Sequence, residues 1–490
     1  MTSETIASDP TSMAEPADPA HAARNSLVIN VLLVSTFVVM LNETAMSVAI
    51  PRLMQALDVP ASAAQWLTTA FLLTMAVVIP VTGFLMQRLN SRPIFILAML
   101  LFSAGTLLAA LSPNLAVLIV ARVVQASGTA IMMPLLMTTV MTLVPPDQRG
   151  KMMGNISIVM SVAPAIGPAA AGLILNYLDW RWIFIIVLPI ALSALALGYR
   201  LMVNTTTPRY APLDVVSVVL SALAFGGIVY GLSNFVVPDA PIPGVWALAV
   251  GVVTMVLFVW RQRGLQKKDA ALLDLRTLKS KNYTISMSMI ALLMLTMFGT
   301  IILLPIYLVQ VLGFDTLGTG LLMLPGSLLM GLLGPFVGRL YDKIGPTPLV
   351  VPAMALVCVV LWAMTLLGVG TWWPYILVGH LVMSIGFAFL FGPLFTASLS
   401  SVPPQLYSHG SALLGSIQQV AGAAGVALFV AIMSSQSAAL AATGQTPLEA
   451  LAGGIRLAFI VGASISLLAL VAAFFVRKPP AQEGGWGGGH

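Results

Sequence analysis

The most constraining feature of this sequence is a series of fourteen apolar stretches distributed along its 490 residues. A helix of about 20 apolar residues is long enough to cross the hydrocarbon core of a bilayer. Membrane-spanning β-strands are not expected, since the stretches lack the alternating pattern of about 10 residues that such strands show. The sequence therefore predicts an all-α polytopic membrane protein with fourteen spanning helices. Their expected starts lie near Leu27, Trp66, Ile94, Leu115, Met152, Trp182, Val215, Val245, Tyr283, Leu317, Leu349, Trp372, Ser408 and Ile455.

The composition supports this class and excludes several others. Hydrophobic residues make up 59% of the chain and charged residues only 8%, whereas soluble domains carry about 25% charged residues. The net charge of +6 is too dilute for a nucleic-acid-binding face. One cysteine excludes a disulfide framework, and four scattered histidines suggest neither a metal site nor an enzyme. Because the sequence also lacks a phosphate-binding G-x-x-x-x-G-K-[ST] loop, we expect no cofactor, nucleotide or nucleic-acid partner.

The basic residues predict the orientation of the chain in the membrane. If the N-terminus is cytoplasmic, alternation of the loops places nearly all of the 22 Lys and Arg side chains inside. A bias of Lys and Arg toward cytoplasmic loops is the established orientation signal. We therefore expect a bacterial-type cytoplasmic (inner) membrane protein with both termini inside. The exceptions are Arg52, Arg181 and Arg456, which are expected outside, and Arg122, which is expected within a span.

The spans divide into groups of six, two and six. The two middle spans carry almost no polar side chains and precede the basic segment 261–281, which we interpret as a solvated cytoplasmic connector. This layout predicts two pseudo-repeated six-helix bundles with two inserted helices. The expected units are a disordered cytoplasmic tail (1–26), an N-terminal bundle (27–202), linker helices with the basic loop (203–282), a C-terminal bundle (283–478) and a flexible Gly-rich tail (479–490).

Two loops at equivalent places in the two halves share the pattern Gly, x, Leu, x, Asp, base, x, Gly. The second copy, 338–345, fits throughout, whereas the first copy, 83–90, has Gln87 and Asn90 in place of the Asp and the final Gly. Internal repeats are a feature of transporter folds, so we interpret both loops as cytoplasmic gating elements. The candidate gating residues are Gly83, Arg88, Arg92, Gly338, Arg339, Asp342 and Gly345.

Ionisable residues inside the spans are candidates for function, because charge in a hydrocarbon environment is expensive unless it faces protein or water. Glu43 is the only acid that we place within a span. Arg122 shares a helix face with Gln125 and Thr129, and His380 is a further titratable candidate whose alternative role is simple hydrogen bonding. The candidate proton-coupling residues are Glu43, Arg122 and His380. The candidate substrate cavity consists of Asn42, Thr36, Met40, Ser47, Gln125, Thr129 and Met133.

The fifth span combines helix-weakening residues. Proline removes backbone donors and glycine permits close helix contact, so we interpret the set as a bend, with ordinary packing as the alternative. On the packing alternative Gly167→Ala is tolerated, and we expect Ala to be mild and Leu severe at that position. Methionines 133, 137 and 141 form either an adaptable surface for apolar ligands or plain packing. The candidate bend residues are Pro164, Gly167, Pro168 and Gly172.

Taken together, these motifs resemble the major facilitator superfamily, and in particular its fourteen-span drug:proton antiporter branch, over residues 27 to 478. The resemblance implies proton-coupled efflux of amphiphilic or cationic drugs by alternating access, driven by the proton gradient. Small amphiphilic substrates, protons and membrane lipids are the implied partners. A same-fold exporter of one metabolite, antibiotic or lipid is the alternative, and a membrane-embedded enzyme is a distant one. The matching motifs are 338–345, Arg122-xx-Gln125-xx-Gly128, Gly167-Pro168-xxx-Gly172 and Trp180 to Phe184.

The first span departs from the pattern of this branch. The branch reads Leu-Asp-x-Thr, whereas this chain reads Leu41-Asn42-Glu43-Thr44, so the acid stands one residue later and about 100° further around the helix. A narrower resemblance, to exporters of lincosamide-like substrates, rests on these four residues alone. In the family, the Asp that Gln87 replaces helps to latch the cytoplasmic helix ends. Asp342 keeps that role available in the second half.

Overall fold

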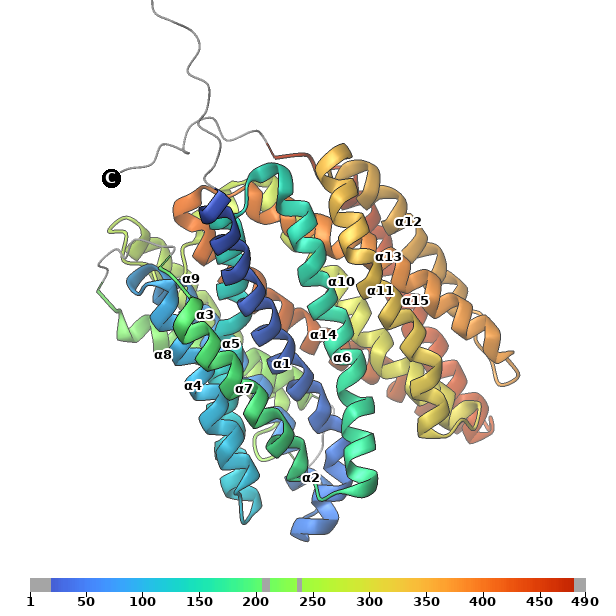
Figure 1. Ribbon diagram of the computed structural model, residues 1–490. Helices are drawn as coiled ribbons and strands as arrows, with labels where there is room; N and C mark the ends of the chain where they lie inside the picture. Colours follow the sequence, from blue (N-terminus) through green and yellow to red (C-terminus); the bar gives the residue numbers. More distant parts are fainter. Residues whose placement is uncertain (1–18, 205–211, 236–239, 480–490) are drawn as a thin grey trace, which may run out of the picture.

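The computed structural model describes residues 19–204, 212–235 and 240–479, and the elements within these ranges are helices (Figure 1). Fourteen helices of the described part are long and apolar enough to cross a membrane, which confirms the predicted class. The first group of six comprises α1 (Pro19–Leu57), α3 (Trp66–Arg88), α4 (Ser91–Ala110), α5 (Leu115–Leu143), α6 (Arg149–Tyr177) and α7 (Trp182–Leu201), with the short α2 (Ala61–Ala64) after α1.

The second group of six follows the inserted pair. Its helices pack mainly on one another, as do those of the first group, so the chain forms an N-terminal and a C-terminal bundle. This group comprises α10 (Lys281–Ile306), which continues into the π-helical turn η3 (Tyr307–Val311), α11 (Thr316–Ile344), α12 (Thr347–Met364), α13 (Trp373–Ser400), α14 (Tyr407–Ala442) and α15 (Pro447–Ala473). Short 3-10 turns precede α6, α10 and α14, namely η1 (Pro146–Gln148), η2 (Leu275–Lys279) and η4 (Pro404–Leu406).

The two bundles meet along two pairs of helices. Helix α6 packs along α11, and α3 packs along α14, as Figure 1 shows for α6 and α11. We call the end of the molecule where α1 begins and α3 and α11 end the basic end, since it carries Arg88, Arg149, Arg200 and Arg339. The hydrogen bonds between the two bundles gather toward this end.

The inserted pair consists of α8 (Val215–Ser233) and α9 (Gly244–Gln266). The two helices pack closely on one another because Gly227, Gly231 and Gly251 face the backbone of the partner helix, with no room for a Cβ atom. Helix α8 also packs against α3 and α14, one from each bundle. The rings of Trp66 and Tyr230 lie 6.0 Å apart at the α3 contact. The inserted pair therefore covers the seam between α3 and α14.

The basic segment between α9 and α10 is not a solvated connector along its whole length, so that interpretation is wrong in part. Ala270 to Leu273 are buried, and Asp274 is only 3% exposed. The buried amide of Gln262 explains this, because its Oε1 accepts hydrogen bonds from the backbone N–H groups of Leu272 (2.8 Å) and Leu273 (3.3 Å). A satisfied backbone can be buried without the usual desolvation penalty.

Two helix starts differ from the expected ones. Helix α1 begins at Pro19, so residues 19–26 of the expected disordered tail are helical, while residues 1–18 lie outside the described part, as do residues 480–490 of the expected Gly-rich tail. Helix α15 begins at Pro447 because Thr446 and Glu449 form a capping box. Arg456 consequently lies within α15 and not in the outer loop where the alternation of the spans placed it.

Candidate functional site

A buried polar network in the N-terminal bundle is centred on Arg122. This residue lies seven positions into α5 and is 1% exposed. Its Nη1 donates to Gln125 Oε1 (2.5 Å) and to Asn42 Oδ1 on α1 (3.4 Å). Gln125 in turn donates through Nε2 to Thr106 Oγ1 on α4 (2.8 Å). The guanidinium carbon also lies 4.0 Å from the ring centroid of Phe71 on α3, so four helices of the bundle converge on one cation.

The local sequence explains how these helices come together. Arg122 and Gln125 are three residues apart and share a face of α5. Gly128 and Gly105 let α4 and α5 approach closely, since a Cβ at Gly128 would lie 2.7 Å from the backbone N of Phe102 and a Cβ at Gly105 would lie 2.5 Å from the backbone N of Gln125. The Arg-Gln-Gly spacing therefore combines a polar pair with the close approach that brings Thr106 within reach.

Glu43 stands beside this network. It is half-buried on α1, directly after Asn42, and lies within Coulombic range of the Arg122 guanidinium. The shifted acid of the first span therefore still acts on Arg122 through its charge, while Asn42, at the usual acid position, supplies the hydrogen bond. A carboxyl group in this setting can exchange a proton while a fixed positive charge remains next to it.

The other residues of the predicted substrate cavity differ in how far their side chains are buried. Thr36 is buried, while Met40 and Met133 are half-buried. Thr129 is buried and its hydroxyl donates to the carbonyl of Gln125 (3.0 Å). Ser47 lies on α1, but its side chain is outside the description. Two methionines of the predicted stripe, Met137 and Met141, are fully packed in the core, as the packing alternative requires.

His380 is not part of the Arg122 network. It lies on α13 in the C-terminal bundle, is 7% exposed, and its Nε2 is 3.0 Å from the carbonyl oxygen of Met323 on α11. The structure therefore does not bring the two predicted titratable groups, Glu43 and His380, into one network. Hydrogen bonding between two helices of its own bundle accounts for the position of His380.

The fifth span is a single unbroken helix, α6, which runs through Pro164 and Pro168. Gly167 faces α1, where a Cβ would contact the Thr44 hydroxyl and lie 2.8 Å from the carbonyl oxygen of Leu41. These residues flank Asn42 and Glu43, so Gly167 determines how closely α6 approaches the site. A Cβ at Gly172, by contrast, would meet nothing within 4 Å.

This contact corrects the expectation that Gly167→Ala is mild. The Thr44 side chain can rotate away from a new methyl group, but the backbone oxygen of Leu41 cannot. Overpacking of this kind costs about 1–3 kcal/mol, so the Ala variant should lower the stability measured by thermal melting, and the Leu variant should lower it further. Gly172→Ala on the same helix is the matched control, and equal melting curves for both Ala variants would contradict the assignment.

A second site closes the interface at the basic end. Asp342 of α11 accepts hydrogen bonds from the backbone N–H groups of Gly150 and Lys151, each at 2.8 Å, at the start of α6. A carboxylate at a helix N-terminus is stabilised by the unpaired N–H groups and by the helix dipole. In the repeated loop at the end of α3, the position equivalent to Asp342 is neutral: Gln87 Nε2 donates to the carbonyl of Gln405 (3.4 Å).

Glycines carry much of this closed interface. A Cβ at Gly154 of α6 would lie 2.7 Å from the carbonyl carbon of Gly334 of α11. In the same way, a Cβ at Gly338 of α11 would lie 2.7 Å from the carbonyl carbon of Gly150 of α6. We call these four residues the glycine seam. On the other side, Gly83 of α3 faces His409 and Ala412 of α14, and the hydroxyls of Thr138 and Ser411 are 2.7 Å apart in the interior.

The remaining predicted gating residues have other positions. Arg92 donates to the carbonyl oxygen of Tyr199 (2.7 Å), which is a contact between α4 and α7 within one bundle. Arg339 is exposed, and Arg88 is the last residue of α3. Gly345 ends α11 with φ of 79°, a conformation that favours glycine, and its N–H bonds to the carbonyl of Tyr341.

Sequence reasoning missed several of these partners. Nothing in the sequence marked Thr106 or Phe71, which reach Arg122 only through the packing of their helices. The glycine seam did have a signal, because glycines four residues apart, at 150 and 154 and again at 334 and 338, are typical of closely packed membrane helices.

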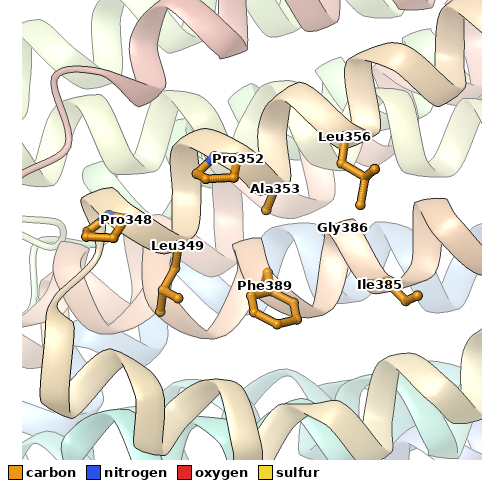
Figure 2. Close-up of a pocket in the computed structure, with 8 residues that line it drawn as sticks. All are labelled: Pro348, Leu349, Pro352, Ala353, Leu356, Ile385, Gly386 and Phe389. Atoms are coloured by element: carbon orange, nitrogen blue, oxygen red, sulfur yellow. The ribbon is translucent and has the colours of Figure 1, made fainter.

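An apolar groove of about 340 Å³ lies elsewhere, between α12 and α13 (Figure 2). Pro352 and Phe389 face it from the two helices, and none of its lining residues is ionisable. It contains none of the predicted site residues. The groove is therefore separate from the Arg122 network and from the closure at the basic end.

The contribution of Arg122 can be tested directly. In Arg122→Ala the acceptors Gln125 and Asn42 lose a buried partner, which costs about 1–3 kcal/mol per group, so the melting temperature of the purified protein should fall. Arg122→Lys keeps the charge but loses the planar fork, and should be the milder variant. Arg200→Ala, at an exposed position, is the control. A wild-type melting temperature in Arg122→Ala would show that the network is dispensable for stability.

Comparison with known proteins identifies the family to which this chain is similar. The family model for the Major Facilitator Superfamily matches residues 32–426. The chain is similar to the lincomycin resistance protein LmrB of Listeria monocytogenes, with 37% identity over 92% of this chain and 96% of that protein. LmrB of Bacillus subtilis is 35% identical over 91% and 95% of the two chains.

Solved structures show the same fold. The human organic anion transporter MFSD10 has a TM-score of 0.65 at 16% identity, and covers 92% of this chain and 99% of its own. The proton:xylose symporter XylE has a TM-score of 0.64 at 14% identity, with coverage of 94% and 97%. The matching family and relatives are transporters and not enzymes, as the sequence predicted.

Proposed function

Because this chain belongs to the major facilitator superfamily, we propose that it exports amphiphilic or cationic drugs across the cytoplasmic membrane in exchange for protons. The observation that carries the proposal is the position of Glu43 beside the Arg122 network. Of the acidic residues in the described part, Glu43 is the one within the apolar interior of a span; Asp342 and Glu449 lie at helix ends. An intramembrane carboxyl group is costly and therefore points to function.

The proposed cycle uses one carboxyl group for two ligands. Protonation from the outer side makes Glu43 neutral, which lowers the cost of keeping it in a low-dielectric interior while the bundles reorient. Release of the proton to the cytoplasm restores the carboxylate, which then binds a cationic substrate. Because substrate and proton compete for Glu43, their fluxes are coupled. For an uncharged substrate, the inward proton gains about 2.3 kcal/mol per 100 mV. Exchange for a monocation moves no net charge and is driven by the proton concentration difference.

The conformation supports alternating access with the basic end in the cytoplasm. There, Asp342 and the glycine seam hold the bundles together. Arg122 and Glu43 lie in the half of the bundle away from this closure. We therefore assign the structure to a state closed toward the cytoplasm. Return to the inward-facing state requires Asp342 to leave the N-terminus of α6.

The relatives suggest the first substrate to test. The names of the LmrB proteins refer to lincomycin resistance, so we propose lincomycin as a substrate of this chain. The test is uptake of lincomycin and of a monocationic dye into everted vesicles, with and without an imposed proton gradient. Gradient-dependent uptake is expected, and it should disappear when a protonophore is added. Equal uptake with and without the proton gradient would overturn proton coupling. If neither compound is transported, the result would favour an exporter of a single metabolite or lipid.

A further inference from the structure

A concave basic surface lies at the end of α9, outside the transport site. We call it the α9 pocket; it has a volume of about 540 Å³ and is lined by Trp260, Arg261, Arg263, Gly264, Leu265, Lys267 and Lys268. Helix α9 faces outward from the bundles and packs chiefly on α8. Its last turns therefore present the pocket to the surroundings of the protein.

The charges in this pocket are not equivalent. Arg261 is neutralised by Asp214, to which its Nε and Nη2 donate at 2.6 and 2.8 Å. This hydrogen-bonded pair holds the pKa of Asp214 well below its usual range. Nearby, Arg276 is paired with Asp269 and Asp274, each at 2.6 Å.

Three other bases in the pocket have no such partner. Arg263, Lys267 and Lys268 are exposed, and none of them forms a salt bridge with a carboxylate of the described residues. The negative end of the α9 dipole offsets only about half a charge. The nearby acids Asp214, Asp269 and Asp274 are thus paired with Arg261 and Arg276. The positive charges of the other three bases remain available to bind an anion.

Hydrogen bonds of the buried Gln262 amide fix the backbone around the pocket. Gln262 is fully buried; its Nε2 donates to Ser217 Oγ (2.7 Å), and its Oε1 accepts the two backbone N–H groups that follow the pocket. Asp269 takes the left-handed conformation (φ 49°) that turns the chain back, and Ala270 N–H bonds to the carbonyl of Leu265. The bases are therefore carried on a defined turn, which reduces the entropy lost on binding.

The depth of the pocket relative to the bilayer follows from its neighbours. Trp260 is 74% exposed and stands at the end of the apolar run of α9. Exposed tryptophans are enriched where a membrane meets water. One turn earlier, Val256 and Leu257 are 64% and 46% exposed and provide an apolar surface. The three bases therefore lie at the level of lipid headgroups, with an apolar helix surface directly below them.

We propose that the α9 pocket binds the headgroup of an anionic phospholipid. Arg263, Lys267 and Lys268 contact the phosphodiester, Trp260 packs at the glycerol level, and the acyl chains lie along the outer face of α9. Clusters of bases next to a membrane helix attract anionic lipids by about 1 kcal/mol per base. The lipid is a ligand distinct from the exported substrate, so this proposal does not depend on the transport mechanism.

The test measures lipid retention by the purified full-length protein. In detergent, with phosphatidylglycerol or phosphatidylcholine added, native mass spectrometry should show preferential binding of phosphatidylglycerol to the wild type. The triple variant Arg263→Gln, Lys267→Gln, Lys268→Gln should bind it about 100-fold more weakly, since three bases contribute about 1 kcal/mol each. The control variant Arg200→Gln, Arg477→Gln, Lys478→Gln removes three exposed bases from the same end of the molecule and should bind like the wild type.

Further measurements separate the alternatives. Inorganic phosphate and glycerol phosphate should not compete at concentrations at which phosphatidylglycerol saturates, whereas full competition would assign the pocket to a soluble phosphate. Trp260→Ala, which leaves all bases in place, should also weaken lipid retention. Equal losses in the two triple variants would mean that net charge alone attracts the lipid and would overturn the site. Unchanged retention in the pocket variant, or no preference for phosphatidylglycerol by the wild type, would overturn it as well.

Discussion

Glu43→Gln is expected to abolish uphill efflux while leaving the protein folded and inserted. Glutamine has nearly the size of glutamate and keeps hydrogen-bonding capacity, but it cannot bind and release a proton. With one proton exchanged per cycle for an uncharged substrate, 100 mV lets the wild type build a gradient of about 50-fold. For a monocation the exchange moves no net charge, and the proton concentration difference alone sets the gradient. The variant should reach only the passive distribution. The measurement is the steady-state accumulation of lincomycin or a cationic dye in everted energised vesicles.

The outcome is specific if a matched variant behaves normally. Glu449→Gln makes the same chemical change at an exposed helix start and should retain full accumulation. Any downhill movement of substrate in Glu43→Gln should occur without proton movement, and cationic substrates should bind more weakly because the carboxylate is absent. Wild-type accumulation by Glu43→Gln would refute its role as the proton carrier and would direct attention to His380, the remaining predicted titratable group.

Gly154→Ala is expected to prevent full closure of the basic end. The added Cβ would lie 2.7 Å from the carbonyl carbon of Gly334 and 2.9 Å from the Cα of Pro335, both of them backbone atoms that cannot rotate away. A cost of about 1–3 kcal/mol to the closed state shifts the conformational equilibrium about 5- to 150-fold toward the opposite state. Because transport requires both states, the efflux rate should fall by a comparable factor, while thermal stability in the other conformation is preserved.

Chemical accessibility distinguishes this effect from misfolding. Ser411 is 1% exposed in the closed interface, so a Ser411→Cys reporter, in a background without Cys358, should react slowly with a water-soluble maleimide. Adding Gly154→Ala should speed the reaction, whereas Gly172→Ala on the same helix, which faces open space, should not. If Gly154→Ala transports normally and leaves the reporter protected, the glycine seam is not required for closure.

The motif spacing allowed much of the candidate site to be predicted. Arg122 and Gln125 had to share a face of their helix because they are three residues apart, and the structure places them in one hydrogen-bonded pair. The loop motif of the second half likewise marked Asp342 as a polar contact at a helix end, and its carboxylate does cap α6. In both cases the chemistry resides within one helix or at its end, where sequence spacing is a direct guide to geometry.

Other features depended on which helices become neighbours. The packing argues against the mild effect expected of Gly167→Ala, because the Leu41 backbone that fills the space belongs to a different helix. The basic segment was expected in water, but Gln262 pairs with its backbone and draws part of it into the protein. His380 was a second titratable candidate beside Glu43, and the fold separates the two into different bundles.

The sequence by itself determined the class, the fourteen spans and the identity of the few intramembrane polar groups, because the cost of exposing backbone and charge to lipid acts on each segment separately. Only the tertiary structure decided that Asn42 hydrogen-bonds to Arg122 while Glu43 acts on it through charge, and that glycines on α6 and α11 close the basic end. Such contacts join residues far apart in the chain, and their strength depends on distances of a few tenths of an ångström, which the packing of whole helices sets.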